Sequence, residues 1–263
     1  MSSPVLDVRK LTMDFGGIRA LDCVDLDVNA GEIVALIGPN GAGKTTFFNC
    51  ITGIYAPSSG EVLVEPMGQL QRRINGYKPN KVTELGMART FQNIRLFPDM
   101  TVLENVMIGR HIRNKSSILG AVLQTRHTRE QERLVVEKSY EMLELVGLTG
   151  FANELSSNLP YGEQRRLEIA RAMATEPFLL LLDEPAAGMN PQETQALEAL
   201  VDRIRQKLQI AILLIEHDMK MVMSVSDRVF VMEYGQRIAT GKPEEVSKNP
   251  DVIRAYLGED EDD

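Results

Sequence analysis

The residues with the clearest chemistry form one glycine-rich stretch, Gly38-Pro39-Asn40-Gly41-Ala42-Gly43-Lys44-Thr45, followed by Thr46. The stretch fits the pattern G-x-x-x-x-G-K-[ST]. Its glycines would let backbone N–H groups approach phosphate oxygens closely, and Lys44 would reach the β- and γ-phosphates of a nucleoside triphosphate. The Thr45 hydroxyl would ligate Mg²⁺. The pattern therefore predicts a phosphate-binding loop; the competing interpretation is a glycine-rich turn that only caps a helix.

Two carboxylates follow the longest apolar run of the chain. Phe178–Leu182 is succeeded by Asp183 and Glu184. Such a run is typical of a buried strand, and open α/β sheets bind ligands at the carboxyl ends of their strands. Asp183 could then hold Mg²⁺ through water, and Glu184 could polarise the water that attacks a γ-phosphate. Alternatively, the pair merely opens a loop and caps the next helix; the phosphate loop favours the catalytic interpretation.

Apolar patterning predicts the elements that must position these residues. Ile33–Ile37, directly before the phosphate loop, and Ala211–Ile215 are also continuous apolar runs, as expected of strands buried on both faces. A helix is expected from about Thr45. Another is expected over Pro191–Leu208, where the apolar residues sharing one face are Leu197, Leu200, Val201, Ile204 and Leu208. Strands that alternate with helices favour a parallel sheet with crossover helices.

The flanking segments have other patterns. Residues 5–28 indicate antiparallel strands joined by a Gly-Gly turn. From about 101 to 174 the patterns are helical, which predicts a helical subdomain inserted between two sheet-forming segments. Residues 228–239 indicate a hairpin, and residues 244–257 indicate one short helix that closes the chain.

Two capping boxes mark helix starts within the helical segment. Thr101 precedes Glu104, and Thr128 precedes Gln131, at the spacing of such boxes. Each threonine hydroxyl could accept a bond from the backbone N–H three residues on, while the acid or amide reaches back. We therefore expect one helix to begin after Thr101 and a second to begin after Thr128 and to end at Val146.

Composition restricts the class of protein. The 263 residues are 43% hydrophobic, carry a net charge of −8 and include two cysteines, Cys23 and Cys50, which fit no metal spacing and suit a reducing compartment. The acidic balance argues against a nucleic-acid binder, and residues 259–263 form an acidic tail that we expect to be disordered. Because no stretch approaches about 20 apolar residues and the start lacks a leader pattern, a cytoplasmic location is expected.

Over essentially its whole length the chain resembles the ATP-binding-cassette (ABC) ATPases. Besides the phosphate motifs, Phe91-Gln92-Asn93 matches the glutamine loop of that family, and Glu216-His217-Asp218 matches its switch histidine. The resemblance implies that Gln92 contacts Mg²⁺ and the attacking water, that His217 hydrogen-bonds the γ-phosphate, and that Phe15 stacks on adenine. For His217 and Phe15 the alternative is a purely structural role.

The resemblance also implies a fold: an α/β P-loop NTPase with a RecA-like parallel core sheet, an N-terminal antiparallel β-subdomain and an inserted α-helical subdomain at about residues 93–174. This is the ABC ATPase fold, as one domain over residues 1–258. The implied cofactors are ATP and Mg²⁺. The implied catalytic residues are Glu184, His217 and Gln92, and the implied metal ligands are Thr45, Gln92 and Asp183.

The signature segment of the family, usually Leu-Ser-Gly-Gly-Gln, is recognisable but altered here. It falls on Leu159-Pro160-Tyr161-Gly162-Glu163, followed by Gln164. Pro160 removes a hydroxyl and a backbone N–H expected at the γ-phosphate of a partner subunit, whereas Gly162 and the helix start behind it can still offer donors. Asn190 likewise stands where the family usually has Asp. Neither change affects ATP binding by this chain's own phosphate loop.

The resemblance implies a working dimer in which each ATP lies between one phosphate loop and the opposing signature. Because Pro160 alters that signature, we hypothesise a heterodimer with two unequal sites, which a Pro160→Ser variant would test. The surface from Gln92 to about Arg110, with the helical insert, would dock the cytoplasmic helix of a membrane permease. Ordinary core packing is the alternative for the apolar residues of that surface.

Several stretches are similar to the ATP-binding subunits of bacterial branched-chain amino acid uptake systems, at residues 11–17, 88–97, 184–191 and 249–258. This similarity implies an importer with two permease subunits, a periplasmic solute-binding protein and a position on the inner face of the inner membrane. The similarity favours an ATPase that energises uptake of branched-chain amino acids; because urea or amide importers use similar ATPases, another small solute of that kind is the alternative.

Other classes fit less well. A DNA-maintenance ATPase would carry a long coiled-coil insertion, and no sustained heptad run occurs. A translation-associated cassette protein would usually contain two cassettes, and one set of motifs is present. A GTPase is disfavoured because Asn80-Lys81-Val82-Thr83 has Thr83 where the guanine-reading motif needs Asp.

Overall fold

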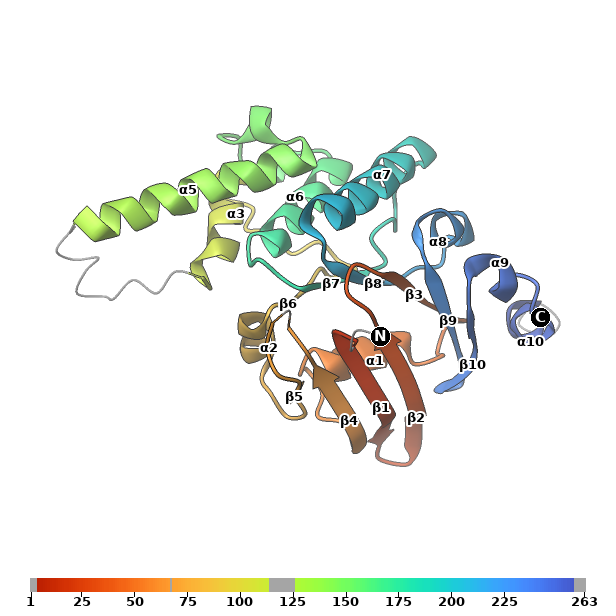
Figure 1. Cartoon of the computed structure of the whole chain (residues 1–263). Helices are drawn as coiled ribbons and strands as arrows, with labels where there is room; N and C mark the ends of the chain where they lie inside the picture. The colour runs from red at the N-terminus through yellow and green to blue at the C-terminus, as the bar shows by residue number, and fades with distance from the viewer. Residues whose placement is uncertain (1–3, 67, 114–125, 258–263) are drawn as a thin grey trace. The chain divides into compact units, whose positions relative to one another are not determined.

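The computed structural model describes residues 4–66, 68–113 and 126–257 (Figure 1). The chain divides into two compact units. The sheet unit comprises Met1–Arg89 and Phe178–Asp263, and the helical unit comprises Thr90–Pro177. The insertion predicted at about 93–174 falls within the limits of the helical unit, and the predicted acidic tail lies outside the described residues.

The main sheet of the sheet unit has six strands in the order β10-β9-β3-β8-β7-β6. Their bounds are β3 Ile33–Ile37, β6 Met87–Arg89, β7 Leu179–Asp183, β8 Ala211–Ile215, β9 Arg228–Glu233 and β10 Gln236–Gly241. Strands β9, β3, β8, β7 and β6 run parallel to one another, and β10 returns antiparallel to β9. The predicted strands at 33–37 and 211–215 are confirmed residue for residue, and the one at 178–182 lies one residue further along.

A second, antiparallel sheet belongs to the same unit. It contains β1 Leu6–Phe15, β2 Ile18–Val28, β4 Ser59–Val64 and β5 Arg72–Arg73, in the order β2-β1-β4-β5. The predicted antiparallel pair over residues 5–28 is therefore confirmed, with its turn at Gly16-Gly17. The helices of the sheet unit are α1 Lys44–Ile51, α2 Pro79–Leu85, α7 Pro191–Leu208, α8 Met219–Val225, α9 Pro243–Val246 and α10 Pro250–Leu257.

Burial fixes the position of β3, the strand that leads into the phosphate loop. Every residue of β3, β7 and β8 is buried, so these strands are apolar on both faces, as a parallel sheet covered by other elements requires. One apolar cluster joins β3 to α1 and to the second sheet through Leu36, Phe47 and Leu26. Burying these side chains contributes about 25 cal/mol per Å² of apolar surface, so the strand that carries the loop is among the most strongly fixed elements.

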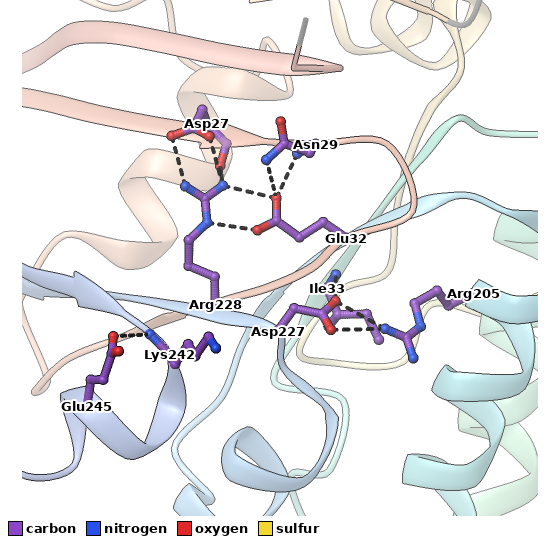
Figure 2. A network of polar contacts seen from close by, with 9 residues as sticks. All are labelled: Asp27, Asn29, Glu32, Ile33, Arg205, Asp227, Arg228, Lys242 and Glu245. Atoms are coloured by element: carbon purple, nitrogen blue, oxygen red, sulfur yellow. Dashed lines mark hydrogen bonds and ion pairs between the residues drawn. The ribbon is translucent and has the colours of Figure 1, made fainter. Parts of the chain in front are cut away.

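A charged network fastens strands that lie far apart in the sequence (Figure 2). Arg228, the first residue of β9, donates through Nε to Glu32 at 2.8 Å and through Nη2 to Asp27 at 2.8 Å. Asp227 accepts a bond from the backbone N–H of Ile33 at 2.8 Å. The start of β3 is thus bound through side chains both to β9 and, through Asp27 at the end of β2, to the antiparallel sheet.

The helical unit contains α3 Val102–His111, α5 Arg126–Val146 and α6 Tyr161–Met173, with short 3₁₀ turns at Thr149–Phe151 and Ser156–Asn158. The capping box predicted at Thr101 is confirmed: its hydroxyl accepts from the backbone N–H of Glu104. The cap predicted at Thr128 is wrong, because α5 begins at Arg126 and already includes that residue. In the described part of the chain no helix is long and apolar enough to cross a membrane.

The end of the chain departs from prediction in one respect. The expected hairpin is present as β9 and β10, joined at Tyr234-Gly235. The single helix expected over 244–257 is instead two helices, α9 and α10, because Pro250 cannot continue a helix and disfavours helical backbone at Asn249.

Candidate nucleotide site

The phosphate loop connects the end of β3 to the start of α1. Two of its glycines are required by space as well as by backbone angle. A Cβ on Gly38, where φ is +148°, would lie 2.0 Å from the carbonyl oxygen of Met232. A Cβ on Gly43, where φ is +97°, would lie 2.6 Å from the carbonyl oxygen of Ala20. The loop is therefore packed against backbone on two sides, which fixes the directions of its N–H groups.

Lys44 folds back into this loop. Its side chain is buried, and Nζ donates to the carbonyl oxygens of Gly38 at 2.7 Å and Pro39 at 2.8 Å. The ammonium is thus held over the loop beside the first turn of α1, a turn that carries no acidic residue. Positive charge and helix N–H groups act together here, which suits an anion of high charge. Thr45 is exposed and Thr46 half-buried in the same turn.

Asp183 ends β7 and is buried. Its Oδ2 accepts a bond from Nη2 of Arg89 at 2.6 Å, and the two side chains are only 6% and 7% exposed. The second terminal nitrogen of the guanidinium, Nη1, donates to Asn49 in α1 at 2.8 Å and to Thr52, the C-cap of that helix, at 3.2 Å. Sequence reasoning missed Arg89; a charged residue at the end of a strand in a parallel sheet was the available signal.

Glu184 and His217 are brought together. Each follows the end of a strand, β7 and β8, which are neighbours in the sheet. His217 Nε2 lies 2.8 Å from Glu184 Oε1, in a hydrogen bond from the imidazole to the carboxylate. Glu184 has φ of +47°, an uncommon value for a residue other than glycine, and its N–H donates to the carbonyl of Ile215 at 2.9 Å. Such strain persists where the surroundings enforce it.

Glu216 supplies part of that enforcement; the sequence motif that contains it assigned a role only to His217. Its carboxylate is buried and accepts from the backbone N–H of Ala186 at 2.8 Å and of His217 at 3.0 Å. Burial raises the pKa of Glu216, while these N–H donors oppose the rise. One buried carboxyl thus ties the loop after Glu184 to the loop that carries His217.

Phe15 ends β1 and is 41% exposed. Its ring meets that of Tyr55 edge to face, with 5.2 Å between centroids and 80° between planes. An exposed aromatic face in the sheet unit fits a platform for a base, and Tyr55 is the member of the pair that sequence reasoning missed.

Gln92 and the signature segment, Leu159–Gln164, belong to the helical unit. Gln92 is exposed, and its carbonyl accepts from Arg165 Nη2 at 2.7 Å. Pro160 is the N-cap of α6 and makes no side-chain capping bond; Leu159 precedes it, and Tyr161–Gln164 form the first turn of the helix. Leu159 is buried, Tyr161 is 43% exposed, and Gly162 is buried. Gln164 Nε2 donates to the carbonyl of Leu159 at 2.8 Å, and Glu163 pairs with Arg166.

The oxygen donors available here suit Mg²⁺ better than they suit a metal ion whose ligands all come from the protein. Among the residues that the structure describes, no three His, Cys, Asp or Glu side chains gather as a metal-binding group. The sheet unit offers the Thr45 hydroxyl, which is exposed, and the Asp183 carboxylate. Mg²⁺ keeps several waters and is commonly bound through one or two protein oxygens together with substrate phosphates. The residues present therefore fit that ion.

Comparison with known proteins adds independent information. The family model described as ABC transporter matches residues 21–187, and the one described as branched-chain amino acid ATP-binding cassette transporter matches residues 236–262. The chain is 48% identical to the high-affinity branched-chain amino acid transport ATP-binding protein LivG of Escherichia coli K12, over 98% of this chain and 100% of LivG. Identity and both coverages are the same for BraF of Pseudomonas aeruginosa.

A solved structure with the same fold also resembles the chain. It is the ADP conformation of an ATP-binding cassette of an ABC transporter, with 32% identity and a TM-score of 0.83, over 98% of this chain and 100% of that one. The likeness thus extends over both units, and the solved cassette binds a nucleotide.

Proposed function

The chain belongs to the ABC transporter family of ATP-binding cassettes, and on that premise we propose that it hydrolyses ATP to drive uptake of branched-chain amino acids. One observation carries the hydrolytic part. The phosphate loop, Glu184 and His217 follow the ends of β3, β7 and β8, which are adjacent strands. The cargo rests on the identity with LivG and BraF over nearly the whole chain.

The phosphate loop would hold the triphosphate. Lys44 is already inside the loop, so its ammonium needs only to exchange carbonyl partners for β- and γ-phosphate oxygens. The backbone N–H groups of the loop and of the first turn of α1 would bind the remaining oxygens. Thr45 and Asp183 would hold Mg²⁺, which when bound neutralises phosphate charge. Phe15 would support the adenine ring.

Glu184 would act on the attacking water. Its side chain is 16% exposed, and its carboxylate is kept in place by His217. A carboxylate so held can accept a proton from water as the oxygen attacks phosphorus. The imidazole of His217, 41% exposed, could turn from the carboxylate to the γ-phosphate once a nucleotide is present. Gln92, from the helical unit, would complete the set by orienting the same water.

The partners we propose are those of an importer. A second cassette would place its phosphate loop against the signature segment of this chain, in a dimer formed with ATP. Two permease subunits would bind the helical unit near residues 92–110, and a periplasmic protein would deliver the solute. The complex would lie on the inner face of the inner membrane. If Pro160 makes the two sites unequal, Pro160→Ser should raise turnover at one site; unaltered turnover at each would contradict that asymmetry.

Transport in vesicles tests the function as a whole. The chain would be purified from native membranes with its companions and reconstituted with ATP inside. We expect ATP-dependent uptake of labelled leucine. Uptake of urea instead would replace the cargo while leaving the ATPase, and absence of ATP binding by the purified chain would contradict the proposal entirely.

One variant tests the chemistry. Glu184→Gln should keep ATP affinity while turnover falls by roughly 10²-fold or more, because water activation is lost. The exposed Glu244→Gln serves as the matched control. Unchanged turnover in Glu184→Gln would remove that residue from the proposed role.

A further inference from the structure

Helix α6, which starts with the signature segment, carries two arginine–carboxylate pairs of the same spacing. Arg165 Nη1 lies 2.9 Å from Glu168 Oε2, and the two side chains are 0% and 2% exposed. Arg166 Nη2 lies 2.6 Å from Glu163 Oε1, with exposures of 29% and 24%. The chain therefore contains a buried pair and, one residue along, a partly exposed pair on the same helix.

The buried pair holds the main chain of the glutamine loop. Arg165 donates through Nη1 to the carbonyl of Phe91 at 2.6 Å and through Nη2 to the carbonyl of Gln92 at 2.7 Å. Glu168 Oε1 accepts from the N–H of Arg95 at 3.2 Å and, more weakly, from that of Phe91 at 3.4 Å. One ion pair therefore hydrogen-bonds main-chain carbonyl and N–H groups at Gln92 and on both sides of it.

Stability alone does not account for this arrangement. Burial raises the pKa of Glu168, and Arg165 opposes that rise, so the carboxyl is costly to keep charged at this position. A buried ion pair is often no more stabilising than apolar side chains of similar volume. What apolar residues could not supply is the planar fork of the guanidinium, which binds two successive carbonyl groups in a fixed direction.

The start of α6 also contacts the pair. Tyr161, which stands where the family usually has glycine, places its hydroxyl 3.3 Å from Arg165 Nη2. The segment proposed to contact the ATP of a partner subunit is therefore connected, through one helical turn and one guanidinium, to the carbonyl of Gln92.

We propose that Arg165 and Glu168 are positioning residues for Gln92, and that they relay the state of the signature segment to it. This rests on the proposed function, because Gln92 acts only where ATP is hydrolysed. When the first turn of α6 shifts on binding a partner's nucleotide, Arg165 shifts with it and carries the main chain of Gln92. The pair would thereby make hydrolysis in one site depend on the occupancy of the other.

Hydrolysis by the reconstituted transporter compares the two arginines. Arg165→Met should lower turnover by up to about 10²-fold, the cost of misplacing a reacting group by about 1 Å. The affinity for MgATP should be retained, because the phosphate loop belongs to the sheet unit. Arg166→Met, on the same helix, should alter turnover by no more than about twofold, as expected of a partly exposed side chain. Equal losses in the two variants would overturn the proposal.

A conservative variant separates positioning from packing. Arg165→Lys keeps the charge beside Glu168 but has no fork that can bind two carbonyls. It should therefore unfold at a higher temperature than Arg165→Met does, because Glu168 keeps a charged partner, while turnover stays low. Wild-type turnover in Arg165→Lys would show that the charge suffices and would contradict the positioning role.

Fluorescence gives a readout that does not depend on activity. The chain contains no tryptophan, so Asn93→Trp, at an exposed position next to Gln92, would be the sole tryptophan. Its anisotropy should fall when Arg165→Met is added and stay unchanged with Arg166→Met. Unchanged anisotropy in both would overturn the proposal. If the wild-type complex binds no ATP, the proposed function itself fails. If Arg165→Met keeps the wild-type rate although the anisotropy of the tryptophan falls, only the relay is rejected.

Discussion

The two units hold their proposed functional residues differently: Lys44, Asp183 and Glu184 of the sheet unit have buried or half-buried side chains, whereas Gln92 of the helical unit has an exposed side chain on a main chain that Arg165 holds. Lys44, Asp183 and Glu184 each have a short side-chain contact. The Gln92 side chain is exposed, and its carbonyl is the group that Arg165 fixes. This difference predicts that substitutions at the functional residues of the sheet unit are restricted by side-chain chemistry. Substitutions that affect Gln92 are predicted to be restricted by the position of the backbone.

This contrast offers an explanation for the altered signature. If the segment works through the turn that it forms, Pro160 and Tyr161 can replace the usual residues, because Pro160 is the N-cap outside the helix and the N–H groups of the following turn remain. In the phosphate loop, by contrast, a Cβ at Gly38 would meet a carbonyl oxygen 2.0 Å away. Four predictions test how far the contrast holds.

The largest effect is expected at Lys44. Lys44→Ala removes the one ammonium inside the phosphate loop, and hydrolysis should fall by about 10³-fold, the upper scale for losing a single preorganised donor. ATP affinity, measured by equilibrium dialysis, should fall as well. The exposed Lys248→Ala provides a control of the same chemistry. Full hydrolysis in Lys44→Ala would end the assignment of the loop.

The next effect concerns Arg89. Removing it leaves the Asp183 carboxylate buried beside an apolar group, so Arg89→Met should lower the free energy of unfolding by roughly 3 kcal/mol. Urea unfolding followed by circular dichroism measures this. The exposed pair Lys81–Glu84 supplies the comparison, since Lys81→Met should cost less than about 1 kcal/mol. Equal costs would mean that Asp183 is not held as described.

A smaller, pH-dependent effect is expected at Glu216. Its pKa is raised by burial, so the folded state favours the protonated form; the stability this contributes is present at low pH and is lost as pH rises through the raised value. Glu216→Gln cannot titrate there. The free energy of unfolding of the wild type relative to the variant should therefore decrease as pH rises above the usual carboxyl range. A constant difference from acid to neutral pH would contradict this.

The smallest effect is expected at Tyr161. Tyr161→Phe removes a long contact of 3.3 Å to Arg165 and leaves the ring, so it should change turnover by less than about 1 kcal/mol, or roughly fivefold. A stopped assay of phosphate release is sufficient. A loss as large as that of Arg165→Met would instead assign the relay to the hydroxyl, and would weaken the idea that the signature tolerates change.

The sequence was informative wherever the determining pattern is local. Ile33–Ile37, Ala211–Ile215 and Pro191–Leu208 have the predicted bounds because burial on both faces, or on one helical stripe, leaves a repeating pattern. Where a helix starts or ends depends on few residues. The predicted helix start after Thr128 and the predicted continuous helix through Asn249 were therefore wrong. The phosphate loop, Asp183 and Glu184 could be proposed because each belongs to a short run of consecutive residues whose types together indicate one chemical role.

What could not be predicted are partners remote in sequence. Arg89 and Asp183 are 94 positions apart, Arg165 and Phe91 are 74 apart, and Glu216 and Ala186 are 30 apart. The position of Arg89 at the end of a strand marks it as unusual, but no local pattern identifies the remote group that a given arginine will contact. Only the folded chain determines that partner.

The order of strands has a consequence for how the protein is made. β3, which ends in the phosphate loop, pairs only with β8 and β9, and the Arg228–Glu32 contact spans 196 positions. Both neighbours are synthesised long after β3 itself. A nascent chain on the ribosome therefore cannot complete the pairing of the strand that carries the phosphate loop until residues 228–233 have emerged, and until then an unpaired apolar strand must be kept from aggregating.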